Sequence, residues 1–323
     1  MTQKLSKRTR SLSLPGRQRT LFRWRPDQQW DGYLFVLPSL AGLVVFTAFP
    51  VIFSLVISLF DWNMIGKPRF VGFDNYAALF TRDIIFREVS WNTLIFLVSI
   101  VPIQMACSIM LALALNLRLR GNSVFRVVYY MPVITTIVAA AIMFQFIFDR
   151  NYGILSAVIW NLIERWSIPM TPPDWLNHPG WSKVAVVILT LWKNFGFSTI
   201  IFLAALQSIP QELYEAAAID GANVWQQFWK ITLPMISSTT FFIFIILCIG
   251  AFQLFGESFI LTRGGPGYAT MTIVQYIYQN AFEFFRMGRA SAVAWVLFAA
   301  IFVFTIIQWH VQRYWVYYET GER

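Results

Sequence analysis

Long apolar stretches without charged residues recur along the chain and predict helices that cross a membrane. Four such stretches contain no Asp, Glu, Lys or Arg, and two more contain a single one, Lys193 or Glu257. The apolar core of a bilayer is about 30 Å thick, which requires about 20 residues of α-helix. Pro38 and Pro50 are expected to bend the first helix. We therefore predict six transmembrane helices, near residues 33–60, 92–116, 127–148, 184–207, 235–262 and 290–311.

The composition agrees with a membrane protein and argues against an ordinary soluble enzyme. Hydrophobic residues make up 57% of the 323 positions and charged residues 13%, whereas a soluble domain has about 25% charged residues. Two cysteines, Cys107 and Cys248, are too few for a disulfide scaffold or a cysteine-rich metal site. His178 and His310 have no ligand-like neighbours, and no nucleophile–base pattern stands out. We predict neither a metal site nor catalytic residues.

The net charge of +9 is concentrated near the N-terminus and indicates topology rather than nucleic-acid binding. Residues 1–25 contain eight Lys and Arg residues and no acid. Because basic residues favour cytoplasmic segments, this tail and the arginines near 118–126 place the N-terminus inside. We expect a basic cytoplasmic tail over 1–32, which either contacts membrane lipid or is solvated and only fixes the topology. We also expect a cytoplasmic C-terminal tail over 317–323.

The predicted inner segment between the fourth and fifth spans has a pattern of its own. Pro210 can begin a helix because the first helical turn does not need its missing N–H. Three alanines then favour the helix, and Gly221 permits the positive φ that ends one. An aromatic amphipathic stretch over 225–230 predicts a second short helix, and Pro234 marks entry into the fifth span. The segment carries three acids and one lysine, which membrane topology does not explain.

Seven residues of this segment match a motif at every defined spacing. The motif is E-A-A, three residues, G, nine residues and I-x-L-P, formed by Glu215, Ala216, Ala217, Gly221, Ile231, Leu233 and Pro234. It resembles the EAA loop of permease subunits of binding-protein-dependent ATP-binding-cassette (ABC) importers. The alternative is an amphipathic helix that lies on the membrane surface without a partner. The resemblance implies a coupling loop over 210–234 that docks on an ATPase subunit through Glu215, Ala216, Ala217, Asp220, Gly221 and Pro234.

Shorter segments elsewhere resemble the carbohydrate-uptake branch of these permeases, the maltose-type permeases. The matching stretches lie at 33–38, 49–50, 70–76, 148–155, 204–210 and 261–266, and the last contains the turn T-R-G-G-P. The likeness covers about residues 30–316, and the chain as a whole is similar to permeases of alginate-oligosaccharide importers. It implies an all-α membrane protein with six transmembrane helices in the type I importer architecture. The permease domain would span 33–316, with a cytoplasmic coupling helix between the fourth and fifth spans.

The partners that the resemblance implies fit the lack of an ATP-binding motif. No Walker A pattern occurs in the sequence, so the energy must come from another subunit or from a gradient. The family implies two cytoplasmic ATPase subunits that bind ATP and magnesium, a second homologous permease subunit and an extracytoplasmic solute-binding protein. The chain itself would hold no cofactor and catalyse no reaction. It would lie in the bacterial inner membrane with both termini in the cytoplasm.

Polar residues inside the predicted spans are the candidates for a substrate path. Charged side chains at membrane depth are costly and usually face a cavity or a partner. Lys193 lies between Trp192 and Asn194 in the fourth span. Gln253 and Glu257 are four residues apart in the fifth span, where they would share one helix face. An aromatic ring beside hydrogen-bonding groups suits a sugar; the alternatives are that these residues join helices or that Glu257 lies at the outer interface.

Three classes of function are compatible with these patterns. The first is a permease subunit of an ATP-driven importer that moves a sugar or oligosaccharide inward by alternating access, including an anionic one such as an alginate oligosaccharide. Glycerol phosphate or a polyol is the alternative substrate. The second class is a gradient-driven secondary transporter, which should show internal repeats or a relay of buried acids, and Glu257 alone is a poor relay. The third is a membrane-embedded enzyme, which should show clustered catalytic residues.

Overall fold

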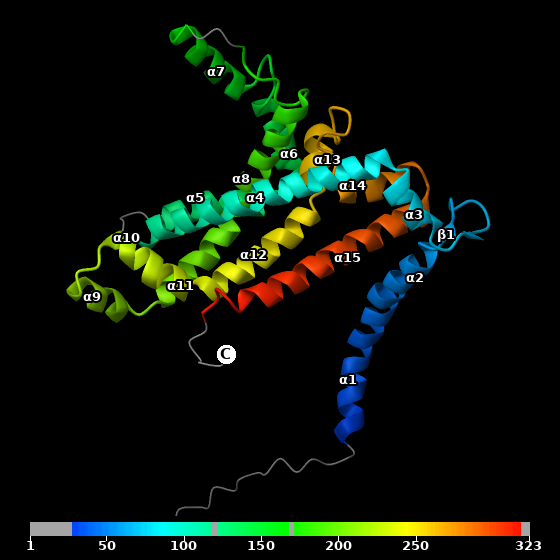
Figure 1. Cartoon of the computed structure of the whole chain (residues 1–323), viewed down its shortest axis with the longest axis horizontal. Helices are drawn as coiled ribbons and strands as arrows, with labels where there is room; N and C mark the ends of the chain where they lie inside the picture. The colour runs from blue at the N-terminus through cyan, green and yellow to red at the C-terminus, as the bar shows by residue number, and fades with distance from the viewer. Residues whose placement is uncertain (1–27, 118–121, 168–170, 318–323) are drawn as a thin grey trace, which may run out of the picture. The chain divides into compact units, whose positions relative to one another are not determined.

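The computed structural model describes residues 28–117, 122–167 and 171–317. The chain divides into two compact units, Met1–Phe53 and Ser54–Arg323. Most of the predicted N-terminal tail and nearly all of the predicted C-terminal tail lie outside the described residues. Regular structure in the described residues is helical except for one short two-stranded ribbon, in agreement with the predicted all-α class (Figure 1).

The first unit contains an apolar helix that is long enough to cross a membrane. It runs through α1 (Gln28–Leu43), a π-helical turn η1 (Val44–Ala48) and α2 (Phe49–Ile57), whose last residues belong to the second unit. The turn η1 ends two residues before Pro50 and contains Phe46, whose carbonyl lies four residues before that proline. A proline ring clashes with that carbonyl in a regular α-helix. The wider winding therefore accommodates Pro50 without ending the helix.

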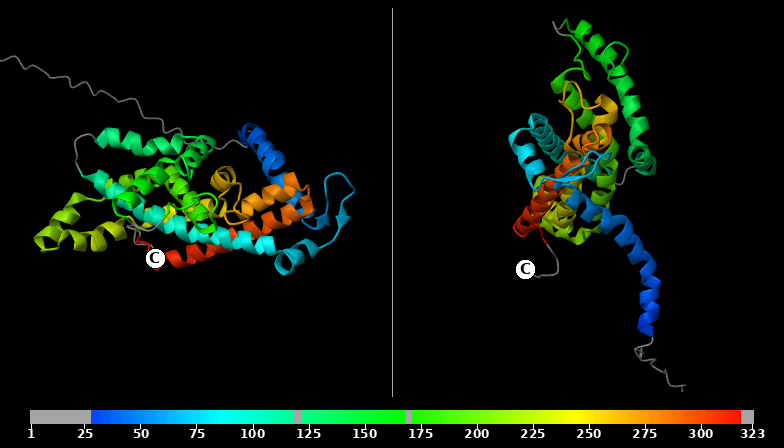
Figure 2. Two further views of the ribbon diagram at one scale, coloured as in Figure 1. Left: turned by 90° about the horizontal axis from the view of Figure 1, so that it is seen from above. Right: turned by 90° about the vertical axis from the view of Figure 1, so that its right-hand side faces the viewer.

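The second unit begins with a short antiparallel ribbon and continues with helices of very different length. In the ribbon, β1 (Phe60–Asp61) pairs with β2 (Arg69–Phe70). Figure 1 shows α9 and α3 at opposite ends of this unit, and the view from above in Figure 2 agrees. The helices in chain order are α3 (Asp74–Thr81), α4 (Ile84–Asn116), α5 (Asn122–Ile134), α6 (Ile137–Ile147), α7 (Ile154–Arg165), α8 (Pro179–Ser208), α9 (Gln211–Ile219), α10 (Val224–Gln227), η2 (Phe228–Thr232), α11 (Leu233–Met235), α12 (Ser237–Phe252), α13 (Gly256–Thr262), α14 (Ile273–Tyr278), η3 (Gln279–Glu283) and α15 (Met287–Gln312).

Four helices of the described residues are long and apolar enough to cross a membrane alone, and six spans result if each of two bent helix pairs counts as one. Helix α4 starts eight residues earlier than predicted, and α8 starts five residues earlier. Asp83 begins α4 by accepting a hydrogen bond from the N–H of Phe86 (2.9 Å), and His178 begins α8 by accepting one from the N–H of Gly180 (3.2 Å). Such capping residues are polar, so an apolar window misses these helix starts.

The predicted helix over 127–148 is two helices. α5 and α6 meet at 99° around Thr135 and Thr136. Pro132 removes a backbone donor near the end of α5. The hydroxyl of Thr136 then begins α6 by accepting a hydrogen bond from the N–H of Ala139 (3.3 Å). The prediction of one continuous helix is therefore wrong, although the apolar stretch is present.

The predicted helix over 235–262 is also interrupted. α12 ends at Phe252, α13 begins at Gly256, and the helical segment before α12 meets it at 67°. The carbonyl of Leu254, within the break, accepts a hydrogen bond from the hydroxyl of Thr272 (2.6 Å). Buried backbone groups need such partners where a helix stops. The break is thus part of the packed structure, and one continuous helix over this range is wrong.

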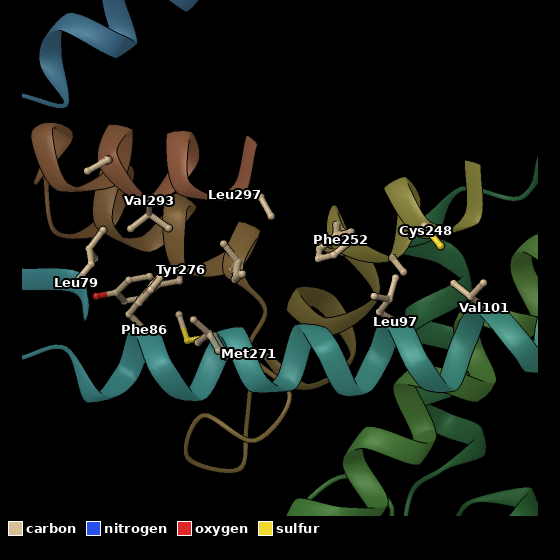
Figure 3. Packing of buried hydrophobic residues seen from close by; sticks show 14 residues of the cluster. Leu79, Phe86, Leu97, Val101, Cys248, Phe252, Met271, Tyr276, Val293 and Leu297 are labelled. Atoms are coloured by element: carbon tan, nitrogen blue, oxygen red, sulfur yellow. The ribbon is translucent and has the colours of Figure 1, made fainter. Parts of the chain in front are cut away.

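Helix α4 lies at the centre of the packing. It contributes to three apolar clusters, which it forms with α12, α14 and α15, with α6, α8 and α13, and with α5, α8 and α12. Figure 3 shows part of the first cluster, where Phe86 lies beside Tyr276 and Leu97 lies near Phe252. Lipid tails are as apolar as these side chains, so close fit must hold the helices together inside a membrane.

Helices α5 and α8 approach each other closely at Gly196. A Cβ atom there would lie 2.5 Å from the carbonyl oxygen of Tyr129 and 3.0 Å from Cγ2 of Val133. Small residues permit such close approach between membrane helices. Lys193, about one turn earlier in α8, contacts the same part of α5. This crossing fixes the position of the predicted substrate residues.

A buried polar cluster, which we call the Asp83 junction, joins α4, α14 and α15 through Asp83, Tyr276 and Arg289. The Asp83 carboxylate accepts a hydrogen bond from the Tyr276 hydroxyl (2.6 Å) and forms a hydrogen-bonded ion pair with Arg289. Burial alone would raise the pKa of Asp83, but the hydrogen bonds from Tyr276, the Phe86 N–H and Arg289 together lower it. Burial and the bond to Asp83 raise the pKa of Tyr276 to about 12.

The turn that follows α13 is fixed onto α4 by side-chain hydrogen bonds. The amide of Asn92 donates to the carbonyls of Tyr268 (2.7 Å) and Met271 (3.2 Å). The hydroxyl of Thr93 accepts a hydrogen bond from the N–H of Ile273 (3.1 Å). Both side chains are buried, and buried polar groups stabilise a structure when they are satisfied in this way. The segment that follows the T-R-G-G-P turn is thus held against α4.

Candidate functional site

The residues of the E-A-A motif lie on a helical hairpin that we call the α9–α10 hairpin, residues 211–232. α9 begins directly after a proline and carries Glu212 in its first turn, where an acid favours the helix dipole. Gly221 ends the helix with a φ of +81°, and the N–H of Ala222 donates to the carbonyl of Ala217 (2.9 Å). The local structure is the short helix and glycine turn that the sequence predicts.

The second arm of the hairpin begins with a capping box. The side chain of Asn223 accepts a hydrogen bond from the N–H of Gln226 (2.8 Å), and the side chain of Gln226 accepts one from the N–H of Asn223 (2.9 Å). The helix continues through α10 and η2 to Thr232, whose hydroxyl lies 2.9 Å from that of Tyr214 on α9. This hydrogen bond ties the two arms into one unit.

Five of the six predicted coupling residues lie on this hairpin. Pro234 lies beyond it, in α11, which leads toward α12. Those on the hairpin occupy α9, its end and the following turn, and they are Glu215, Ala216, Ala217, Asp220 and Gly221. The five coupling residues predicted between 215 and 221 therefore lie together on the hairpin. Pro234, which ends the motif, lies outside it.

The surface of the hairpin combines acidic and large apolar side chains. Glu215 and Asp220 are exposed, and neither is in an ion pair with another described residue. Ile219 is 87% exposed, Val224 82% and Trp225 68%. Exposed apolar patches with a polar rim mark contact surfaces for proteins or membranes. The hairpin has the chemistry of such a surface.

Lys193 is engaged by the protein itself. Its ammonium group donates to the carbonyl of Thr135 (2.9 Å) and to that of Val133 (3.5 Å), at the corner between α5 and α6. The last carbonyls of a helix have no partners within it, and the helix dipole favours a cation there. Lys193 therefore caps α5 and stabilises the corner.

The neighbours of Lys193 also contact other helices or their own. The ring of Trp192 packs against Phe144 of α6, with ring centroids 5.2 Å apart. The side-chain amide of Asn194 donates to the carbonyl of Thr190 in the same helix (3.1 Å). All three predicted residues of this helix are half-buried. The contacts of Lys193 agree with the alternative in which it joins helices, and Trp192 also packs on another helix, whereas the Asn194 amide bonds within its own helix.

Gln253 and Glu257 do not share a helix face, which corrects the prediction. Gln253 is exposed at the end of α12, whereas Glu257 lies in the first turn of α13 beyond the break. The four-residue rule requires one continuous helix. Glu257 is instead close enough to Lys193 for their charges to attract, although the two do not form a direct ion pair.

A cavity that the sequence pattern did not indicate lies between α6, α13 and η3. It has a volume of about 550 Å³. Its residues come from segments far apart in the sequence, and three of them lie outside the predicted spans, so no local pattern joins them. The lining consists of Gln145, Phe259, Ile260, Arg263, Gln279 and Glu283.

Metal-ligating side chains do not cluster in the part of the chain that the structure describes. It contains no group of three or more His, Cys, Asp or Glu that could hold a metal ion. The imidazole of His178 accepts the hydrogen bond that begins α8. Nδ1 of His310 lies 2.9 Å from the carbonyl oxygen of Ile306. Both histidines thus have backbone partners.

Sequence comparisons match the chain to one family and to individual proteins that are named as transport system permeases. Residues 104–315 match the family described as binding-protein-dependent transport system inner membrane component. The chain is 35% identical to the lactose transport system permease protein LacF of Rhizobium radiobacter, over 88% of this chain and 94% of that protein. It is 34% identical to the arabinooligosaccharides transport system permease protein AraP of Bacillus subtilis (strain 168), over 85% of this chain and 86% of that protein.

A solved structure is similar over most of the chain. It is the crystal structure of a bacterial alginate ABC transporter in complex with an alginate pentasaccharide-bound periplasmic protein. One of its chains matches with a TM-score of 0.77 and 26% sequence identity, over 89% of this chain and 95% of that chain.

Proposed function

The chain belongs to the family of inner-membrane components of binding-protein-dependent transport systems, and from this we propose that it is one of two membrane subunits of an ATP-driven importer. Membership confirms the resemblance inferred from the E-A-A motif and the prediction of a transport subunit rather than an enzyme. A gradient-driven transporter is not favoured. The partners in our proposal are a second, homologous permease subunit, two ATPase subunits that bind ATP and magnesium, and an extracytoplasmic solute-binding protein.

The exposed α9–α10 hairpin is the observation that carries the proposal. Its acids, Glu215 and Asp220, lie next to apolar side chains that would be costly to leave in water. In the proposal, a groove of an ATPase subunit receives α9, and Glu215 binds a donor group there. Closure of the ATPase pair on ATP then moves the hairpin. The bond between Tyr214 and Thr232 passes this movement to the segment that leads into α12.

The proposed topology has six spans, with each bent helix pair counted as one. The α9–α10 hairpin faces the cytoplasm as the coupling helix, and both termini lie on the same side. α3 and the β1–β2 ribbon, at the other end of the second unit in Figure 1, then face outward. The excess of basic residues before Asp27 supports this orientation.

A sugar or oligosaccharide is the substrate that we propose. The support comes from the relatives, which are named for lactose and arabinooligosaccharides, and from the similar structure, which belongs to an alginate transporter. Glycerol phosphate or a polyol remains the alternative substrate. We place the path beside Trp192 and Asn194 on α8 and near Gln253 and Glu257. In this proposal Lys193 stabilises the α5–α6 corner by its hydrogen bond to the Thr135 carbonyl.

The test is the ATPase activity of the assembled transporter as a function of sugar-loaded binding protein. In wild type we expect stimulation of several-fold. Gly221→Pro should abolish it, because proline cannot adopt a φ of +81° and has no N–H to donate to the carbonyl of Ala218. Glu215→Lys should abolish it by placing a cation against the ATPase groove. Neither change should prevent membrane insertion.

Two matched variants serve as controls. Gly221→Asn keeps a residue type that tolerates the left-handed conformation, and no atom lies within 4 Å of a Cβ at this position. Glu164→Lys makes the same charge change at an exposed site on α7. Both should retain stimulation. Full stimulation in Gly221→Pro and Glu215→Lys would contradict the coupling role, and no stimulation of wild type by any loaded binding protein would contradict the importer.

A further inference from the structure

The cavity between α6, α13 and η3 lies apart from the residues placed on the substrate path, none of which lines it. We propose that it is a sugar subsite of the transporter and that Arg263 binds the carboxylate of an acidic sugar unit there. The inference rests on the proposed function, because it takes the substrate to be a carbohydrate, and it adds a second site and a selective residue. At about 550 Å³ the cavity has the size of a small-molecule site.

The charged groups of the cavity have unused bonding capacity. Arg263 and Glu283 both line it, yet they form no ion pair with each other, and neither is in an ion pair with another described residue. A guanidinium group presents a planar fork of donors that matches a carboxylate with two parallel hydrogen bonds. The carboxylate of Glu283 and the amide of Gln279 can bind sugar hydroxyls. The lining therefore offers both donors and acceptors to one ligand.

Arg263 is held in a conformation that an arginine rarely adopts. Its φ is +53°, and it ends α13 directly before two glycines. A left-handed backbone at a residue with a side chain costs about 1 kcal/mol and persists where surrounding structure enforces it, often at functional sites. The turn that follows is fixed onto α4 by Asn92 and Thr93. The fold therefore sets the backbone conformation from which the Arg263 side chain reaches the cavity.

One wall of the cavity is aromatic and rigid. The ring of Phe259 stacks on Phe255 (5.1 Å between centroids) and packs edge-on against Tyr278 (5.3 Å), which in turn contacts Phe282 (5.3 Å). The flat face of a sugar ring packs on such surfaces, while its hydroxyls reach polar groups. Small-molecule sites usually combine aromatic and apolar side chains with a small number of precisely placed polar groups.

Gln145 lines the cavity from α6 and is itself held by hydrogen bonds. Its amide nitrogen donates to the carbonyls of Ile260 (2.7 Å) and Leu261 (3.1 Å), which ties α6 to α13. With the nitrogen committed, the side-chain oxygen is the acceptor that Gln145 can offer to the cavity. The lining therefore combines an aromatic ring, Phe259, and a held amide, Gln145, with the charged groups of Arg263 and Glu283.

Protection from a thiol reagent tests occupancy directly. In a Cys107→Ser background, with Cys248 buried, Gln279→Cys introduces one accessible thiol at the cavity. The assembled transporter is labelled with a maleimide in the presence of an alginate pentasaccharide or of a neutral pentasaccharide. We expect the acidic sugar to slow labelling at least threefold, the neutral one to slow it less, and Arg263→Gln to remove the difference. Equal labelling rates with and without either sugar would overturn the proposal.

Transport measurements then separate this inference from the proposed function. Arg263→Gln should raise the KM for uptake of the acidic oligosaccharide at least tenfold, Arg263→Lys should recover part of the loss, and Arg286→Gln, an exposed cation outside the cavity lining, should stay within twofold. Wild type that takes up no sugar with ATP contradicts the proposed function, whatever the labelling shows. Wild-type uptake that Arg263→Gln leaves unchanged contradicts only the subsite.

Discussion

The Asp83 junction and the α9–α10 hairpin are built in opposite ways. At the junction, Asp83 is 4% exposed on its side chain and joins three helices through one ion pair and one hydroxyl. On the hairpin, Glu215 and Asp220 are exposed and have no such partner among the described residues. The first set of polar groups is satisfied within the chain, and the second set is available to another protein. Burial and partners, rather than residue type, separate this structural acid from the acids that we propose for coupling.

Gly288 and Gly221 show that the backbone is also packed in one region and exposed in the other. A Cβ atom at Gly288, in the first turn of α15, would overlap the carbonyl oxygen of Phe60. A Cβ atom at Gly221 would meet nothing within 4 Å, and only the φ of +81° disfavours a side chain there. Gly288 is required by neighbouring structure and Gly221 by its own conformation. Substitution should therefore affect the whole unit in one case and a local turn in the other.

Gly288→Ala should produce the largest loss of stability. The added methyl cannot move away from backbone, so α15 must separate from β1, and we expect a loss of about 3 kcal/mol or more in the free energy of unfolding. Thermal unfolding of the purified protein in detergent measures this. The matched control is Gly250→Ala, in α12, where nothing lies within 4 Å of the added atom. Equal melting temperatures for the two variants would mean that the approach to Phe60 is not rigid.

Asp83→Asn should have a smaller effect on the same region. The amide keeps a partner for Tyr276 but leaves the cation of Arg289 without its counter-charge, and we expect a loss of about 2 kcal/mol. Glu164→Gln, at an exposed site, is the control and should change stability by less than about 0.5 kcal/mol. A loss no larger than the control's would show that the junction does not stabilise the unit.

The stabilisation by Asp83 should depend on pH in a defined direction. The pKa of Asp83 is lower in the folded protein than its ordinary value of about 3.9. The ionised form is thus favoured by folding, and its contribution is complete above the unfolded pKa and lost as pH falls through the folded pKa. The stability difference between wild type and Asp83→Asn should be constant from about pH 5 to 8 and shrink below about pH 4.

Structure that depends on neighbouring residues in the sequence was predictable, and structure that depends on distant ones was not. The hairpin follows from Pro210, the alanines and Gly221, which lie within a few turns of one another. At the corner between α5 and α6, Pro132 and Thr136 are local, but the cation that caps α5 is Lys193 of another helix. The break near Leu254 is bonded by Thr272 of a later turn. The hydropathy pattern shows that these stretches are apolar, but it does not show where the helices change direction.

The candidate functional residues also differ in whether their grouping depends on local or on distant residues in the sequence. The residues that we propose for coupling form one continuous motif, so their grouping could be predicted from the sequence. The cavity joins Gln145 to Arg263 and Glu283 across more than one hundred positions, and nothing local marks them as neighbours. For Gln253 and Glu257 the sequence predicted a grouping that does not exist. Their spacing of four residues predicted a shared helix face, but the helix is interrupted between them. Spacing arguments hold only while the helix continues.

Gly221→Ala should have the smallest effect and test the comparison most sharply. Alanine at a φ of +81° costs about 1 kcal/mol relative to glycine, and no neighbouring atom adds to that cost. Because the hairpin is exposed, the strain can be relieved by local opening, and the melting temperature of the whole chain should stay at the wild-type value. The amide hydrogen of Ala222, which bonds to the carbonyl of Ala217, should exchange about fivefold faster, as 1 kcal/mol implies. A fall in melting temperature comparable to that of Gly288→Ala would show that the hairpin unfolds together with the packed helices, and the two regions would then differ in exposure but not in stability.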